Sequence, residues 1–268
     1  QARGLEFALQ PTHTAHPDYF HKVVDCQWAC PAHTPVPEYI RLIGQGRYDD
    51  AYMVNWASNV FPGVLGRTCD RPCEPACRRG RVEESNGDQP EPVAICRLKR
   101  VAADNKSGSI KARMPAIAPR NGKRVACVGA GPASLTVARD LAPLGYEVTV
   151  FDGESKAGGF IRSQIPRFRL PESVIDEETG YILDMGVLFR NQERVDSLRA
   201  LLQQGYDAVF VGSGAPRGRD LEIPGRRDIT DNIHIGIDWL ASVSFGHITS
   251  IAPRVIVLGG GNTAMDCC

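Results

Sequence analysis

Six cysteines in the first third of the chain have spacings typical of metal ligands. They occur as Cys26-x3-Cys30-Pro31, Cys69-x3-Cys73-x3-Cys77 and a single Cys96. Thiolates are soft ligands that bind the iron of iron–sulfur clusters, and similar spacings also hold structural zinc. The residue types therefore predict a metal site, and the spacing alone leaves both metals open.

A second motif, at 129–134, is typical of a dinucleotide site. Its residues are Gly129-Ala130-Gly131-Pro132-Ala133-Ser134, between an expected strand at 124–128 and an expected helix at 132–144. The glycines let the backbone turn tightly beside a pyrophosphate, while the helix N-terminus supplies N–H donors and a positive dipole. Ser134 takes the third glycine position, where a small residue still lets helix and strand pack closely.

Further residues complete this first nucleotide motif. Asp152 ends the next expected strand, near the place of a ribose-binding carboxylate. Gly158 and Gly159 come shortly afterwards and could line the same ligand. We therefore expect this segment to bind an adenine dinucleotide.

A second nucleotide motif lies near the end of the sequence. Gly259-Gly260-Gly261-Asn262-Thr263-Ala264 follows an expected strand at 255–258. Two such sites predict two nucleotides, most simply FAD and a nicotinamide cofactor. This motif should open a helix for which no room remains before Cys268, and the chain starts at Gln1 without a Met, so we expect a fragment.

The remaining elements must position these motifs. Pro72 and Pro75 forbid a regular helix over 67–81, which places those cysteines on a loop that can fold around a cluster. Short helices are expected at 36–43, at 49–57 and from Pro92, with an arm at 1–17, a polar linker at 105–122 and a further strand at 207–211. Cys127 lies inside the first expected strand and is interpreted as a core thiol.

The composition sets limits on function. The 268 residues are 43% hydrophobic and 23% charged with a formal net charge of +0, which argues against nucleic-acid and membrane-surface partners. We find neither a membrane-spanning run nor a signal peptide in the sequence. A chain of this size does not need disulfide staples, so the nine cysteines favour a reducing, cytoplasmic location.

These motifs together resemble a known family: the small (β) subunit of NADPH-dependent glutamate synthase and its relatives, which include the N-terminal half of dihydropyrimidine dehydrogenase and ferredoxin–NADP transhydrogenases. The matching segments cover most of residues 20–268 in the family's order. They are Cys26-x3-Cys30-Pro31, Gly66-Arg67-Thr68-Cys69, Cys73, Cys77, Pro92-Val93-Ala94-Ile95, Gly129–Ala133, Gly158-Gly159, Ile165–Pro171 and Gly259–Asp266. The resemblance implies two 4Fe-4S clusters, FAD and NAD(P)H.

Two departures from the family concern the cluster ligands. Relatives carry two more cysteines before the first pair, and counting back from Cys26 puts Asp18 and His21 at those positions. Relatives also carry a Gln or Glu ligand at about the position of Lys99 in this chain. Cys96 lies one helical turn earlier, and its thiolate could replace that ligand. The resemblance implies one complete set of four thiolates and a second set completed by His21 and Asp18, or absent. The complete set is Cys30, Cys69, Cys73 and Cys96, and the second contains Cys26 and Cys77.

We therefore predict an α+β multidomain protein. A helical iron–sulfur domain with an N-terminal arm at 1–121 precedes an incomplete Rossmann-like α/β FAD domain at 122–253 and the start of a second α/β nucleotide-binding domain at 254–268. The predicted function is an oxidoreductase subunit that passes electrons between NAD(P)H, FAD and 4Fe-4S clusters to a partner redox subunit. A truncated, non-catalytic iron–sulfur adaptor and a zinc-stabilised flavoprotein are the alternatives. No residue stands out as an acid–base or nucleophilic catalyst, as expected if the cofactors carry the chemistry.

Overall fold

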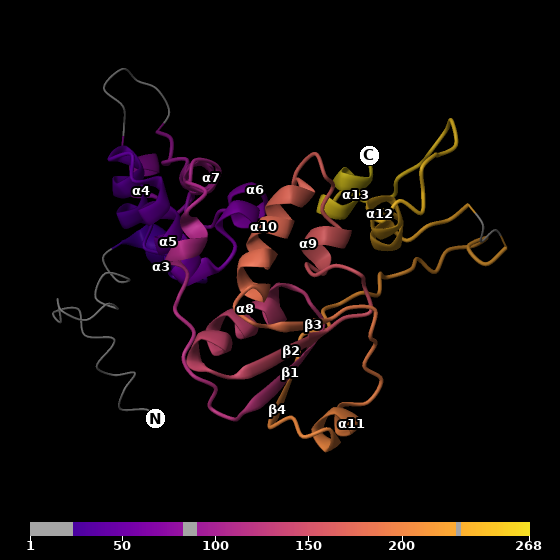
Figure 1. Cartoon of the computed structure of the whole chain (residues 1–268). Coiled ribbons are helices and arrows are strands. Elements are labelled where there is room, and N and C mark those ends of the chain that lie inside the picture. The colour runs from indigo at the N-terminus through magenta and orange to yellow at the C-terminus, as the bar shows by residue number, and fades with distance from the viewer. Residues whose placement is uncertain (1–23, 83–89, 229–231) are drawn as a thin grey trace, which may run out of the picture. The chain divides into compact units, whose positions relative to one another are not determined.

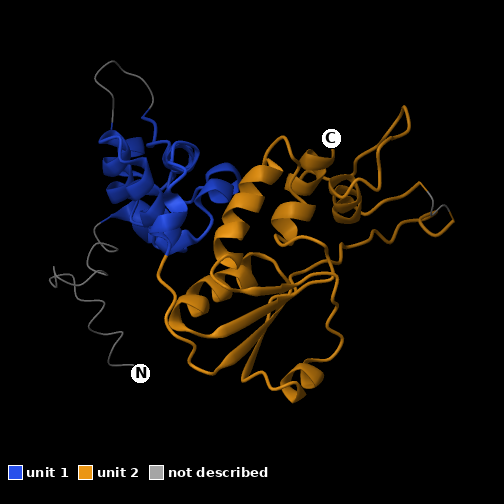
Figure 2. Cartoon of the chain, viewed as in Figure 1, with its two compact units in different colours: residues 1–114 blue, residues 115–268 orange. Residues whose placement is uncertain are grey.

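The chain folds into two compact units, residues 1–114 and 115–268 (Figures 1 and 2). The computed structural model describes residues 24–82, 90–228 and 232–268. The boundary between the units lies inside the polar segment at 105–122. The arm predicted at 1–17 lies outside the described residues.

Unit 1 is built from short helices joined by loops. Its helices are α3 (Asp25–Ala29), α4 (Val36–Gly44), α5 (Tyr48–Asn59), α6 (Pro62–Thr68) and α7 (Ile95–Asp104), with 3-10 turns η1 (Arg78–Arg81) and η2 (Ile110–Arg113). Helix α4 ends before Gly46, whose φ of +71° is unfavourable for other residues. The segment between α6 and η1 is a series of turns, in agreement with the two prolines that it contains.

Two helix starts in unit 1 differ from the sequence prediction. Helix α7 begins at Ile95, not at Pro92. Residues 90–94 have no regular structure, and the first turn is held by the Glu74 side chain, which accepts the Cys96 N–H. Helix α6 was not predicted, since Gly63 and Gly66 lower its helix propensity. A Cβ on Gly66 would lie 2.8 Å from Arg100 Cα, so this glycine lets α6 and α7 approach closely.

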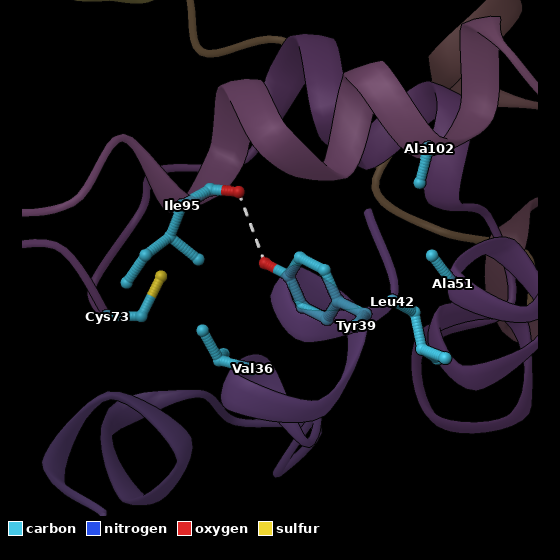
Figure 3. Close-up of a cluster of buried hydrophobic side chains, with 7 residues drawn as sticks. All are labelled: Val36, Tyr39, Leu42, Ala51, Cys73, Ile95 and Ala102. Carbon is cyan, nitrogen blue, oxygen red and sulfur yellow. Dashed lines mark hydrogen bonds between the residues drawn. The ribbon is translucent and has the colours of Figure 1, made fainter. Parts of the chain in front are cut away.

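The core of unit 1 lies between α4, α5 and α7 and includes one of the predicted ligands (Figure 3). Tyr39 is fully buried, and its hydroxyl donates to the Ile95 carbonyl at 3.1 Å. Cys73 joins this cluster from the loop, beside Val36 and Ile95. The hydrophobic core and the cysteine loop are therefore continuous.

Unit 2 contains a four-stranded parallel sheet in the order β3-β2-β1-β4. The strands are β1 (Arg124–Val128), β2 (Glu147–Phe151), β3 (Leu188–Arg190) and β4 (Ala208–Val211). In the register, Cys127 faces Val150 on one side and Phe210 on the other. Cys127 is completely buried, as its interpretation as a core thiol requires.

Helices cover both faces of this sheet (Figure 1). Helix α8 (Pro132–Leu141) packs on β1 and β2 and is joined by α10 (Glu172–Leu183), while α11 (Leu198–Gln203) packs on β4. The short helices α9 (Phe160–Ser163), α12 (Gly236–Ser244) and α13 (Asn262–Cys267) lie together. Turn η3 (Ala142–Leu144) extends α8 to the end of the predicted helix. Covering both faces explains why successive residues of β1 and β2 are buried, with the exception of their ends.

The predicted strand at 255–258 is wrong. These residues have no regular structure, and Val255, Ile256 and Leu258 are 59%, 85% and 69% exposed. A strand requires a neighbouring strand for its backbone hydrogen bonds, and the described residues provide none beside this segment. A helix was not expected to fit between the Gly259 motif and Cys268. It does form, as α13 over Asn262–Cys267. Within the described residues, no helix combines the length and apolarity needed to span a bilayer.

The close approach of α6 and α7 gives a stability prediction. Gly66→Ala should lower the free energy of unfolding of unit 1 by about 1–3 kcal/mol, because the new methyl group overlaps the Arg100 backbone. Denaturant unfolding followed by circular dichroism measures this effect. Gly44→Ala is the matched control, since a Cβ there meets nothing within 4 Å. Equal stability of the two variants would contradict the contact.

Candidate functional site

The described thiols of unit 1 fall into two groups. In the first, the Cys69 and Cys96 side chains share a hydrogen bond, and Cys73 lies close enough to Cys69 and Cys30 to interact electrostatically with both. In the second, Cys26 interacts in the same way with Cys77. The structure thus brings four thiols together in one group and two in the other.

Different elements deliver the four thiols of the larger group. Cys30 immediately follows α3, and Cys69 immediately follows α6. Cys96 lies in the first turn of α7, and Cys73 lies on the loop between α6 and η1. Cys73 and Cys96 are 7% and 6% exposed, so the group is open to solvent mainly through Cys30 and Cys69.

The thiols differ in how readily they ionise. The hydrogen bond from Cys96 lowers the pKa of Cys69, and the same hydrogen bond, together with burial, raises the pKa of Cys96. Burial raises the pKa of Cys73 to about 11, although Lys99 acts in the opposite direction. Burial also raises the pKa of the nearby Tyr39 phenol, which therefore stays neutral.

The surroundings of the larger group suit an anionic, multinuclear centre. Lys99 is only 6% exposed and lies close enough to Cys69, Cys73 and Cys96 to act electrostatically on each of them. Metal-bound thiolates would supply negative charge beside this ammonium. Among the described residues, no three or more His, Cys, Asp or Glu side chains are arranged around a single metal ion. Asp18 and His21 lie outside the described residues.

In unit 2, the first nucleotide motif forms a tight turn between β1 and α8. Gly129 has a φ of +94°, and a Cβ there would lie 2.5 Å from the Gly212 carbonyl oxygen. Gly131 is the N-cap of α8, and a Cβ there would meet nothing within 4 Å. Pro132 occupies the first turn, where its missing N–H costs nothing, and Ala133 is exposed. The turn therefore leaves open space at the N-terminus of a ten-residue helix, where an anion is favoured.

Asp152 and the two glycines after it lie against this turn. One Asp152 oxygen accepts the Ala130 N–H at 2.5 Å, and the other accepts the Glu154 N–H at 2.8 Å. The Gly158 N–H donates to the Ala130 carbonyl at 2.8 Å. A Cβ on Gly159 would lie 2.8 Å from Gly131 Cα, so only glycine allows this approach. The structure thus brings the predicted residues of the first motif together.

A buried arginine, Arg162, holds the loop that contains Gly158 and Gly159. Arg162 is 2% exposed and donates to the Ala157 carbonyl at 2.7 Å, while its guanidinium forms ion pairs with Glu172 and Asp176 at 2.8 and 2.6 Å. A Cβ on Gly158 would press against the Arg162 side chain at 3.0 Å. Arg162 therefore positions the loop that closes the nucleotide turn, and its role was not found from the sequence.

One further residue beside the turn, Gly212, was also missed. Gly212 directly follows β4, and a Cβ there would lie 2.3 Å from Ser134 Oγ. This Ser134 oxygen is buried and has no hydrogen-bond partner among the described residues. The open space at Gly131 and this orphaned hydroxyl fit a bound dinucleotide. The signal available in the sequence was Gly212-Ser213-Gly214 directly after an apolar strand.

The second nucleotide motif forms a separate, more exposed turn. Gly259 has a φ of +140°, Gly261 is the N-cap of α13, and Asn262 and Thr263 are exposed in its first turn. Helix α13 is held through Asp266, whose carboxylate oxygens each lie 2.6 Å from Arg169 Nη1. The structure does not bring this motif to the turn at Gly131; it lies with α9 and α12.

Comparison with known proteins identifies two domain types. Residues 123–268 match the pyridine nucleotide-disulphide oxidoreductase family, and the chain belongs to this family. Residues 19–110 match the domain described as dihydropyrimidine dehydrogenase domain II, 4Fe-4S cluster. An iron–sulfur domain is thus followed by a pyridine nucleotide oxidoreductase domain whose parallel sheet and helices are of the α/β type. The two domain types support 4Fe-4S, FAD and NAD(P)H as the cofactors.

Individual relatives confirm the resemblance seen in the sequence. The chain is 35% identical to the NADP(+)-dependent formate dehydrogenase subunit beta of Moorella thermoacetica, over 90% of the chain and 37% of the relative. It is 35% identical to the NADPH-Fe(3+) oxidoreductase subunit beta of Geobacter sulfurreducens, over 98% and 39%. It is 34% identical to the glutamate synthase (NADPH) small chain of Azospirillum brasilense, over 90% and 52%. The chain thus spans about half or less of the length of these relatives.

Proposed function

We propose that this chain belongs to an electron-transfer oxidoreductase that passes electrons between NAD(P)H, FAD and 4Fe-4S clusters to a partner catalytic subunit. The single observation that carries the proposal is the group of four thiols in unit 1, which precedes a dinucleotide turn in unit 2. Relatives named as beta subunits or small chains support the presence of a partner. When bound, these cofactors supply hydride transfer and single-electron transfer.

The chain's own residues have positioning and electrostatic roles in this proposal. Cys30, Cys69, Cys73 and Cys96 hold the complete cluster, and burial of two of them keeps water away from it. In unit 2, Gly129 and Gly131 admit the FAD pyrophosphate to the N-terminus of α8. Ser134 packs against Gly212 with its hydroxyl unpaired, while Asp152 holds the turn through the Ala130 N–H.

The finer fold assignment is also part of the proposal. We assign unit 2 as a Rossmann-like FAD domain, supported by the parallel β3-β2-β1-β4 order and by the turn that follows β1. We assign the segment from 254 as the start of the NAD(P)H domain, supported by the glycine-rich N-terminus of α13 at Gly259–Thr263. We further propose that Cys26 and Cys77 belong to a second cluster, completed by His21 and Asp18.

Metal content tests the proposed function directly. Anaerobically purified protein should contain iron and acid-labile sulfide, with a broad visible absorption that dithionite bleaches. The reason is that 4Fe-4S clusters are held by four Cys thiolates, and four thiols gather in unit 1. One zinc ion per chain without sulfide would overturn the proposal in favour of a zinc-stabilised flavoprotein.

The assignment of Cys96 as a ligand gives a second test. Cys96→Ser should lower the iron content or alter the EPR spectrum of the reduced protein, because the hydroxyl is a poorer iron ligand than the thiolate. Cys127→Ser is the control, since Cys127 is fully buried between strands of unit 2 and lies outside both thiol groups. Equal iron content and identical spectra in the two variants would remove Cys96 from the ligand set.

The open space above Gly131 gives a third test. Gly131→Val should fold and keep its cluster absorption but lose FAD, because φ at this position is −80° and a side chain would occupy the space assigned to the pyrophosphate. FAD content is measured after heat release of the flavin. Gly180→Val is the control, because a Cβ on Gly180 in α10 also meets nothing within 4 Å. Stoichiometric FAD in Gly131→Val would show that the turn is purely structural.

A further inference from the structure

Lys99 is a buried cation for which the fold provides no conventional partner. It lies on α7, one helical turn after Cys96, and is 6% exposed. Within the part of the chain that the structure describes, Lys99 forms no hydrogen bond and no ion pair. Lys is seldom buried to this extent without a charged partner. The position therefore suits a nearby source of negative charge.

The thiols supply that negative charge once they are deprotonated by metal binding. Lys99 lies close enough to Cys69, Cys73 and Cys96 to act electrostatically on all three. Cys69 comes from the end of α6, Cys73 from the loop and Cys96 from α7, so the thiols approach Lys99 from three elements.

The other charged groups nearby are already engaged elsewhere. Glu74 accepts the Cys96 N–H at 3.0 Å and lies 3.8 Å from Arg71. Arg67 and Arg100 both pair with Asp104 on the far end of α7. Asp70, next to Cys69, is exposed. Tyr39 faces the thiols but uses its hydroxyl on the Ile95 carbonyl.

We propose that Lys99 is the internal counter-ion of the four-thiolate cluster and sets its reduction potential. The proposal rests on the proposed function, because it needs the cluster to be present. Reduction adds one electron to an already anionic centre, and a fixed positive charge in a low-dielectric site stabilises the reduced form more than the oxidised form. Net charge around the cluster is one of the factors that determine cluster potentials. Lys99 is thus a tuning residue that makes this cluster easier to reduce.

The test is an EPR-monitored redox titration of the holoprotein and three variants. Lys99→Met removes the charge and keeps the length of the side chain, while Lys99→Arg keeps the charge. Arg97→Met is the matched control, because Arg97 carries the same charge two residues away on the exposed side of α7. Iron and sulfide are determined in every sample before the titration.

We expect Lys99→Met to lower the midpoint potential. The ratio of reduced to oxidised cluster at a fixed potential should fall at least tenfold, which corresponds to about 59 mV for one electron. Lys99→Arg should stay near the parent value, and Arg97→Met should leave it unchanged. The shift should persist at high salt, because buried charges are screened much less than exposed ones.

Each other outcome has a definite meaning. Equal potentials in Lys99→Met and the parent, with iron present in both, would overturn the inference and leave the proposed function intact. Absence of iron from the parent would overturn the proposed function itself. If Lys99→Met loses its iron, retention of iron at the parent potential in Lys99→Arg supports a requirement for charge. Loss of iron from both variants would instead assign Lys99 to packing and overturn the inference.

Discussion

The N-terminus of helix α7 is the point on which unit 1 depends. The Tyr39 hydroxyl donates to the Ile95 carbonyl at 3.1 Å, and Glu74 accepts the Cys96 N–H at 3.0 Å. The first bond joins α7 to α4, and the second joins α7 to the cysteine loop. Each such bond contributes only about 1 kcal/mol net, but leaving a buried donor or acceptor unpaired costs more. The two bonds therefore fix where Cys96 lies relative to Cys73. A helix could not hold Cys73 in place, because its loop contains two prolines.

The dinucleotide turn of unit 2 depends on a different constraint, the absence of side chains. Added Cβ atoms at Gly129, Gly159 and Gly212 would lie 2.5, 2.8 and 2.3 Å from the nearest non-neighbouring atom. Three segments far apart in the sequence meet at one turn because each is a bare backbone there. Asp152 then joins the turn through the Ala130 N–H, and Arg162 fixes the loop with Gly158. Gly131 differs from these three glycines, because a Cβ there would meet open space. The three crowded glycines are needed for packing, whereas Gly131 borders the candidate site.

Sequence reasoning succeeded where a local rule dominates. Strand β1 has the predicted bounds, because a short apolar run before a glycine-rich turn has few alternatives. Pro72 and Pro75 excluded a helix around Cys73, and the structure has turns there. The strand at 255–258 failed because apolar composition specifies a strand only where neighbouring strands complete it. Helix α6 was not predicted, because glycine has a low helix propensity. Its Gly66 is nevertheless required for the close packing of α6 on α7.

The candidate sites follow the same division. The cysteines and glycines could be found in the sequence because their chemistry is restricted to a few residue types. Lys99, Arg162 and Gly212 matter through contacts that join distant segments, and a lysine, an arginine or a glycine has no distinctive spacing of its own. The overall charge of +0 also conceals the arrangement, since it averages a buried ammonium among thiols with many solvated ions. Under the proposed function, such fixed charges are the means by which the chain itself would influence electron transfer. A buried lysine costs stability in the free protein, and this cost is offset when thiolates bind a cluster beside it. The same charge that tunes the centre therefore also couples its assembly to the folding of unit 1.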